Sequence, residues 1–148
     1  MPEDAAAEFH AKFRLGDLTV CTDQDWTLSV RPAQPVLGAL VLSTRHGATS
    51  FGDLDERTGT GFVRLVAFAE RAARASFGAV RINVLCLMMQ DPLVHFHLLP
   101  RYAEPVEHSG ITWSDPGWPG PPDLGALHVV DDDVLDAIRL TCLSNGSE

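Results

Sequence analysis

Two histidines, His95 and His97, have the residue type and the spacing that proton transfer or nucleophilic chemistry requires. They lie in the run LVHFHLL (residues 93–99), whose apolar alternation is typical of a β-strand. Alternate residues of a strand share a face and stand about 6.5–7 Å apart, so we expect both imidazoles on one face with Leu93. Phe96 and Leu98 then point into the core. Because imidazole titrates near neutral pH, a rigid pair can hold or move a proton there.

Three interpretations of this histidine pair are open. The two rings can be structural, they can supply two ligands of a metal site, or one can attack phosphorus while its neighbour holds the phosphate oxygens. The metal site needs a third ligand, and no candidate has a diagnostic spacing. The candidates are His10, His46, His108, His128 and Asp91.

The elements that must position the pair follow from the apolar spacing of the chain. Helices are predicted over residues 3–15, 53–77 and about 131–144. Strands are predicted over residues 18–22, 26–30, 38–43, 81–89 and 94–101. The last two are separated only by the turn 90–92 and must therefore pair antiparallel. A chain of 148 residues with this order of elements predicts a single α+β domain spanning residues 1–148.

Residues 103–125 form a segment rich in proline and glycine that also contains Trp113 and Trp118. Proline excludes helix and interior strand, so an ordered loop or a wrap-around arm is expected. Large aromatic rings are normally buried. We expect this arm to cover either a ligand pocket or a partner subunit; the alternative is a surface arm that buries tryptophan for stability.

Charge excludes some classes of partner. Twenty acidic against eleven basic residues give a net charge of −9, which argues against nucleic-acid binding. A small phosphate compound in a local pocket stays compatible with this charge. Ten of the eleven basic residues are arginine, which favours bidentate contact wherever a base meets phosphate. No apolar run approaches the ~20 residues of a membrane span, so we expect no membrane and a cytoplasmic protein.

Residues 81–102, RINVLCLMMQDPLVHFHLLPRY, resemble the signature strand pair of the histidine triad (HIT) superfamily. Those proteins carry His-φ-His-φ-His-φ-φ, commonly followed by Pro-Arg, on the last strand. The resemblance covers about residues 18–102. It implies an antiparallel five-stranded sheet with one main helix, here with N- and C-terminal helices added, in a homodimer whose sheets join edge to edge. It also implies hydrolysis or transfer at the α-phosphate of a purine nucleotide conjugate through a nucleotidyl-histidine intermediate.

The resemblance also implies roles for individual residues. His95 matches the central, nucleophilic histidine, and His97 matches the last one, which contacts the phosphate and the leaving group. Asn83 matches a strand asparagine near the nucleotide. The first triad position holds Leu93, which can neither titrate nor donate a hydrogen bond from its side chain.

Two further residues are candidates for substrate binding. Gln90 is a candidate phosphate donor, and Arg31 falls near a ribose-contacting position, although a solvated arginine is an equal alternative. No cofactor is expected, apart from a divalent metal that can accompany polyphosphate substrates. The alternative function is a non-catalytic nucleotide-binding or sensing module that lost turnover with the first triad histidine.

Overall fold

A computed structural model describes residues 2–147 of the chain, with side chains from residue 5 to residue 147. Its centre is a five-stranded antiparallel sheet with the strand order β1-β2-β3-β5-β4. The strands are β1 (Thr19–Thr22), β2 (Trp26–Val30), β3 (Leu40–Thr44), β4 (Arg81–Leu85) and β5 (His95–Arg101). All five predicted strands are present, which confirms the α+β prediction.

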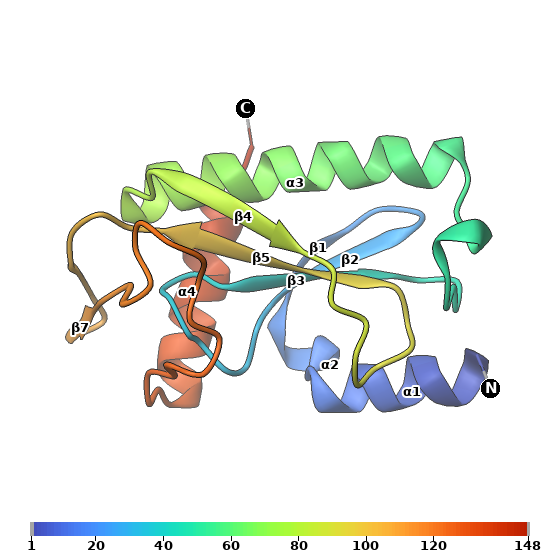
Figure 1. Ribbon diagram of the computed structural model, residues 1–148, viewed down its shortest axis with the longest axis horizontal. Coiled ribbons are helices and arrows are strands. Elements are labelled where there is room, and N and C mark those ends of the chain that lie inside the picture. The colour runs from blue at the N-terminus through green and yellow to red at the C-terminus, as the bar shows by residue number, and fades with distance from the viewer. Residues whose placement is uncertain (1, 148) are drawn as a thin grey trace.

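Helices cover both faces of this sheet (Figure 1). The long helix α3 (Glu56–Phe77) lies on one side, while α1 (Pro2–Lys12) and the short α2 (Leu15–Leu18) lie on the other. The C-terminal helix α4 (Asp132–Asn145) packs against α3 and β1. None of the helices within residues 2–147 has both the length and the apolar character needed to cross a bilayer.

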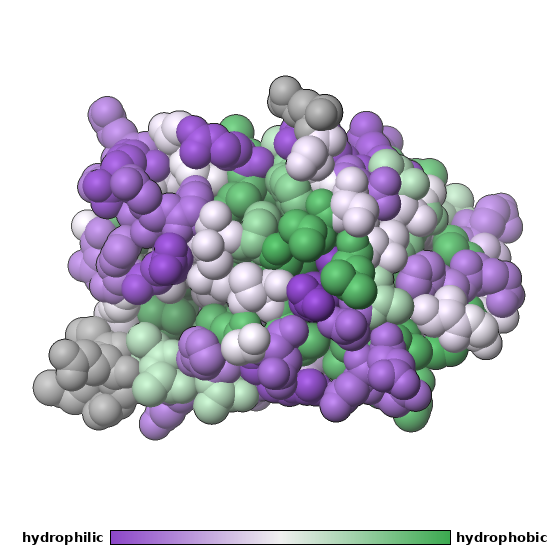
Figure 2. Space-filling view, turned by 180° about the vertical axis from the view of Figure 1, so that it is seen from behind, coloured by the Kyte–Doolittle hydropathy of each residue, from purple (hydrophilic) through white to green (hydrophobic). Residues whose placement is uncertain are grey.

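The main core lies between α3 and the sheet. Alternate residues of the strands, among them Trp26, Leu28 and Leu98, bury their side chains there. Phe96 packs against this core through Trp26 and Phe62, with ring centroids 6.0 and 4.6 Å away. On the opposite face, Val41 of β3 packs with Phe9 of α1. Seen from behind, hydrophilic side chains surround a central group of apolar ones (Figure 2).

The main helix begins later than the predicted Asp53. Asp53 belongs to a separate 3₁₀ turn (Phe51–Asp53), where its carboxylate accepts hydrogen bonds from the backbone N–H groups of Thr49 and Ser50. The helix is capped instead by Asp55, whose side chain accepts the N–H of Thr58 at 3.0 Å. Two aspartates two residues apart both have cap chemistry, and the sequence pattern does not rank them.

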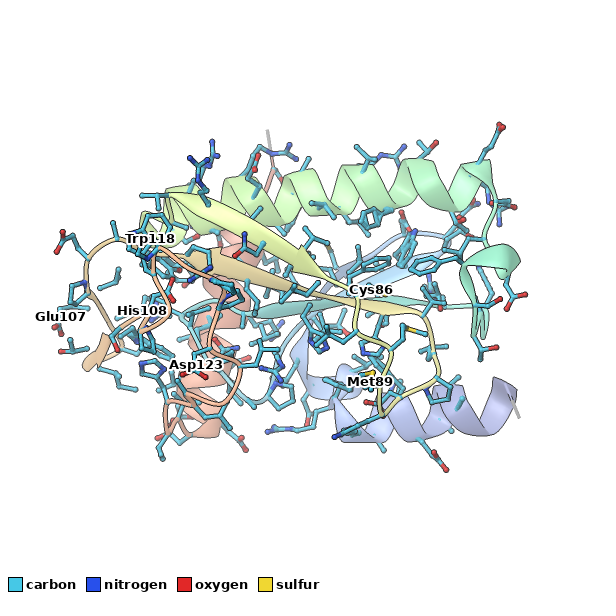
Figure 3. All side chains as sticks on the ribbon, in the orientation of Figure 1. Cys86, Met89, Glu107, His108, Trp118 and Asp123 are labelled. Atoms are coloured by element: carbon cyan, nitrogen blue, oxygen red, sulfur yellow. The ribbon has the colours of Figure 1, made fainter. Side chains whose placement is uncertain are left out.

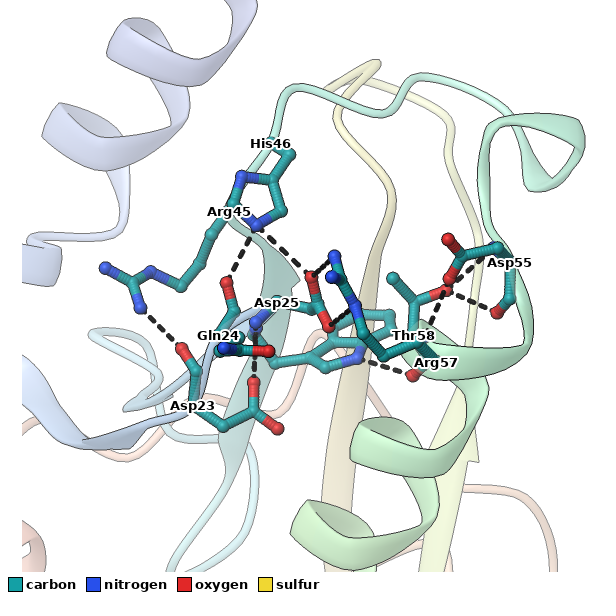
Figure 4. A network of polar contacts seen from close by, with 9 residues as sticks. Asp23, Gln24, Asp25, Arg45, His46, Asp55, Arg57 and Thr58 are labelled. Atoms are coloured by element: carbon teal, nitrogen blue, oxygen red, sulfur yellow. Dashed lines mark hydrogen bonds and ion pairs between the residues drawn. The ribbon is translucent and has the colours of Figure 1, made fainter.

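A polar cluster joins the turn between β1 and β2 to the first turn of α3 (Figure 4). The carboxylate of Asp25 is buried, with 4% of its side chain exposed. It accepts two hydrogen bonds from the guanidinium of Arg57, at 3.1 and 2.9 Å, and lies 3.2 Å from Nε2 of His46. Removing a carboxylate from water is costly unless it is paired, so this contact fixes the turn against the helix.

The connection between the last two sheet strands is longer than predicted. β4 ends at Leu85 rather than residue 89, and residues 86–94 form a loop in which Met88 has a positive φ of 53°. Apolar residues continue past Leu85, so composition alone extends the strand. This loop lies beside α1 (Figure 3), where Cys86 and Met89 are labelled.

The arm at residues 103–125 contains a small hairpin that the proline content did not predict. Its strands are β6 (Val106–His108) and β7 (Ile111–Trp113), and Trp113 is 1% exposed. Nε of Arg101 donates to the buried carboxylate of Asp115 at 2.7 Å, which ties the arm to the end of β5. Trp118 and Asp123 of the arm lie away from Met89 of the loop 86–94 (Figure 3). Within one chain, the arm therefore does not cover this loop.

Candidate active site

The register of the sheet places the two histidines in a central strand. His95 lies opposite Ser43 of β3, and His97 lies between Val41 of β3 and Leu85 of β4. Both histidines are on the face that α1 covers. The centroids of the two imidazole rings are 5.1 Å apart, so the shared face predicted from the strand period is observed.

Helix α1 and the turn after it set two phenylalanine rings on these histidines. Phe9 and Phe13 are four residues apart, and their rings stack with centroids 4.4 Å apart. The ring of Phe9 lies 4.9 Å from that of His95, and the ring of Phe13 lies 6.3 Å from that of His97. His95 is therefore only 3% exposed, and His97 is 9% exposed.

A backbone carbonyl orients His95. Nδ1 of His95 lies 2.6 Å from the carbonyl oxygen of Leu93. A carbonyl can only accept, so Nδ1 carries a proton and Nε2 is the nitrogen left for contact with a ligand. The leucine side chain packs with Phe9, Phe13 and Val41 in a small apolar cluster. Leu93 thus orients the ring through its main chain while its side chain fills space.

His97 is an unpaired base in a positive environment. Nδ1 of His97 is buried and has no hydrogen-bond partner among the described residues. Burial, followed by the positive charge of Arg31 and the neighbouring His95, lowers the pKa of His97 to about 4. The ring is therefore neutral near pH 7 and can donate one N–H hydrogen bond.

Both imidazoles line a pocket of about 350 Å³, which is within the usual range for small-molecule sites. The pocket is mostly apolar, with a few charged groups at its walls. Its lining residues are Lys12, Phe13, Arg31, Pro32, Ala33, Leu87, Met88, Met89, Gln90, Asp91, His95 and His97. Two of the predicted substrate-binding residues, Gln90 and Arg31, are therefore brought to the histidines.

One wall of the pocket joins α1 to the loop 86–94. Nζ of Lys12 lies 2.8 Å from the carboxylate of Asp91 and 3.4 Å from Oε1 of Gln90. Lys12 and Phe13 were not predicted from the sequence as site residues. The helical spacing of Phe9 and Phe13 beside the chain's single lysine was the available signal, but it does not tell which face of the sheet the helix covers.

Another part of the lining is Arg31, the residue after β2. Its backbone N–H donates to the carbonyl of Ala39 at 2.9 Å, which continues the pairing of β2 with β3. Nε and Nη1 of its side chain are buried and have no hydrogen-bond partner among the described residues. Desolvation lowers the pKa of this guanidinium from its usual value.

Asn83 is not brought to the histidine pocket. It lies opposite Leu99, one two-residue step along β5 from His97. Oδ1 of Asn83 accepts a hydrogen bond of 2.7 Å from Nη1 of Arg101. Asn83 instead lines a second pocket of about 440 Å³, together with Arg81, Arg101 and the 118–121 part of the arm.

Of the candidate third metal ligands, Asp91 alone among the described residues lines the pocket of the histidine pair. His46 contacts Asp25, while His108 contacts Ser109 and His128 contacts Gln34. His10 is exposed on α1, and Asp91 is paired with Lys12. Within residues 5–147, no three His, Cys, Asp or Glu side chains gather as a metal site would require.

Comparison with known proteins identifies the fold. No protein-family model matches the sequence, and no curated protein is significantly similar to it. Solved structures do match. A histidine triad protein from Bradyrhizobium japonicum superposes with a TM-score of 0.66 over 88% of this chain and 91% of that one, at 17% identity.

Two further structures give the same result. A HIT protein from Sinorhizobium meliloti has a TM-score of 0.65 at 18% identity, covering 89% of this chain and 93% of that one. A histidine triad protein from Marinobacter aquaeolei has a TM-score of 0.64 at 20% identity, covering 88% and 93%. The chain therefore has the histidine triad fold, which confirms at the level of the fold the resemblance seen in residues 81–102.

Proposed function

We propose that this chain, which has the histidine triad fold, is a nucleotide hydrolase or transferase that acts at the α-phosphate of a purine nucleotide conjugate. The observation that carries the proposal is the geometry of His95. Its Nδ1–H donates to the carbonyl of Leu93 at 2.6 Å, and the ring lines a pocket together with a second imidazole. An oriented imidazole beside a hydrogen-bond donor is the arrangement that nucleophilic catalysis at phosphorus needs.

The proposed reaction has two displacements. The Nε2 lone pair of His95 forms a bond to the α-phosphorus as the bond from phosphorus to the leaving group breaks. The departing atom takes up a proton. Water then attacks the same phosphorus and gives up a proton to His97, the bond to Nε2 breaks, and the nucleoside monophosphate leaves with both imidazoles in their starting state. If another acceptor replaces water, the outcome is transfer.

His97 is proposed to hold the phosphate and to pass the proton to the leaving group. In the free protein, the pKa of His97 is about 4, so this ring begins as a neutral hydrogen-bond donor. A phosphate anion bound beside it raises the pKa of the ring, because opposite charge stabilises the imidazolium. Substrate binding thus supplies the proton affinity that proton transfer needs.

A second candidate function is a nucleotide-binding module without turnover. It is favoured by one observation, namely that Phe9 covers His95 until only 3% of the residue is exposed. Such a module uses the same pocket and the same charges. It differs only in whether Nε2 of His95 reaches phosphorus.

The experiment that separates the two candidates uses a purine nucleoside 5′-phosphoramidate and measures binding and turnover together. For the hydrolase we expect release of nucleoside monophosphate and its loss in His95→Asn, with binding retained. Binding by the wild-type protein without release would exclude the hydrolase and support the module. His10→Asn, an exposed histidine of α1, is the matched control and should turn over normally.

We also propose a homodimer that forms through β4. This strand is at the edge of the sheet, so one row of its backbone N–H and C=O groups has no partner strand. Val80, just before this strand, is 45% exposed, and Val84, on the strand, is 39% exposed. A second copy of the chain would pair the open edge and cover these side chains.

A further inference from the structure

Among side chains 5–147, no acid forms an ion pair with Arg31 in the wall of the histidine pocket. Nε and Nη1 are shielded from solvent and have no hydrogen-bond partner among the described residues. A guanidinium carries five N–H donors and stays charged, so leaving buried donors unpaired costs free energy. Such a group is stabilised when an anion enters the pocket.

The other charges of the pocket do not compensate Arg31. The pocket is lined by two cations, Lys12 and Arg31, and by one acid, Asp91. Asp91 already forms an ion pair of 2.8 Å with Lys12. The pocket therefore keeps about one uncompensated positive charge, although the whole chain carries −9.

The position of Arg31 separates it from the reacting atom. Ser29 of β2 pairs with Val41 of β3, and Val41 pairs with His97, so these three residues form one row across the sheet. Arg31 lies two residues beyond Ser29, on one side of this row. His95 lies two residues from His97, on the other side of the row. A phosphoryl group on His95, contacted by His97, thus leaves Arg31 free for another part of the ligand.

We propose that Arg31 binds a second anionic group of the substrate, a phosphate or carboxylate distinct from the phosphate that His95 attacks. The site would then select nucleotide conjugates that carry two anionic groups over those that carry one. This inference rests on the proposed function, because it assumes that the scissile phosphate lies at His95. Two parts of a conjugate can carry the second anion, namely the sugar and the leaving group.

Calorimetry with three adenine nucleotides in the presence of a chelator tests the inference without turnover. Adenosine 5′-monophosphate is the reference. Adenosine 3′,5′-bisphosphate adds an anion on the sugar, and adenosine 5′-diphosphate adds one on the leaving-group side. Charge-assisted hydrogen bonds predict that one of the two binds the wild-type protein about 10–100-fold more tightly than the monophosphate. The preferred ligand identifies the side that carries the anion.

Variants of Arg31 complete the test. Arg31→Gln should reduce affinity for the preferred ligand at least about 10-fold more than affinity for the monophosphate. Arg31→Lys keeps the charge but loses the planar fork and should lose part of the preference. Arg74→Gln, at an exposed arginine of α3, removes the same charge elsewhere and should leave the preference unchanged.

Two results would overturn the inference. One is a wild-type protein that binds all three nucleotides within a factor of about 2. The other is an Arg31→Gln variant that loses affinity equally for all of them, which would assign Arg31 to the scissile phosphate. Because binding is measured, failure of hydrolysis alone would contradict the proposed function and leave this inference standing. Thermal melting of each variant checks that it is folded.

Discussion

At the scale of single residues, the orientation of His95 depends on a main-chain atom of residue 93 and not on the side chain of that residue. The carbonyl of Leu93 accepts the Nδ1 proton of His95 at 2.6 Å, and any residue at this position supplies the same carbonyl. The leucine side chain, 2% exposed, packs against Phe9 and Phe13. A leucine at position 93 is therefore compatible with an oriented imidazole at His95.

Leu93→His tests this assignment. An imidazole placed in the apolar cluster leaves polar atoms without partners, so we expect the free energy of unfolding in urea to fall by about 1–3 kcal/mol. The rate of phosphoramidate hydrolysis should change less than about 10-fold, because the orienting hydrogen bond is already present. A larger rate increase would show that His95 needs the missing side chain. Leu93→Met is the control that preserves volume.

The pKa of His97 predicts how stability depends on pH. The folded pKa of about 4 is below the ordinary value of 6.5, so folding is favoured when the ring is neutral. This contribution is fully present above pH 6.5 and is lost progressively as the pH falls to about 4, by at most about 3 kcal/mol. Urea unfolding from pH 7 to 4 should therefore be steeper in pH for the wild-type protein than for His97→Gln. Equal slopes would contradict the lowered pKa.

Residue identity alone predicted only part of the site. His95 and His97 were assigned correctly to one face because a strand has a period of two residues. Arg31 and Gln90 reach the pocket, as predicted, but their roles there stay predictions. Asn83 lies on the same face, yet its contact with Arg101 holds it in another pocket. Such a contact depends on strand register, and the desolvation of Arg31 depends on packing; neither can be derived from spacing.

At the scale of secondary-structure elements, α1 covers the histidines of the candidate site. Its buried residues do not enter the main core; Phe9, with Phe13 beyond the helix end, packs on the histidines instead. The apolar spacing predicted the helix but not its docking surface. The same limit applies to α3, whose start at Glu56 is determined by the Asp55 cap and by the contact between Asp25 and Arg57.

The Asp25 cluster predicts an unequal effect of two acidic substitutions. Asp25→Ala removes both hydrogen bonds to Arg57 and the contact to His46, so the free energy of unfolding should fall by about 1–3 kcal/mol. Glu70→Ala removes an exposed pair with Arg74, at 3.8 Å, and should cost less than about 0.5 kcal/mol. Urea denaturation measures both. Equal losses would mean that the cluster does not fasten the turn to α3.

The sequence pattern predicted the start of β5 more accurately than the end of β4. β5 begins at His95, one residue from the predicted start, because the alternation of apolar residues is clear there. β4 was predicted four residues too long, since the apolar residues 86–89 belong to the loop that lines the pocket. Leu87, Met88 and Met89 line the pocket, and composition cannot distinguish an apolar loop of this kind from a buried strand.

At the scale of the whole molecule, the open edge of β4 predicts a self-association that can be broken selectively. Val84→Lys places a charge on the edge strand, and in a symmetric pair the two lysines would lie near each other. We expect light scattering to show a dimer for the wild-type protein and a monomer for this variant. Val63→Lys, at a 68% exposed position of α3, should stay dimeric. A wild-type monomer at all accessible concentrations would contradict the edge contact.

The most direct test of the account is the covalent state of His95 during reaction. Rapid acid-free quenching of the protein with a purine nucleoside 5′-phosphoramidate, followed by intact-mass measurement, should show the wild-type mass increased by one nucleotidyl group. Peptide mapping should locate that group on His95, and His95→Ala should show no such increase. Turnover without any adduct, or an adduct that persists in His95→Ala, would contradict the proposal that Nε2 of this histidine attacks phosphorus.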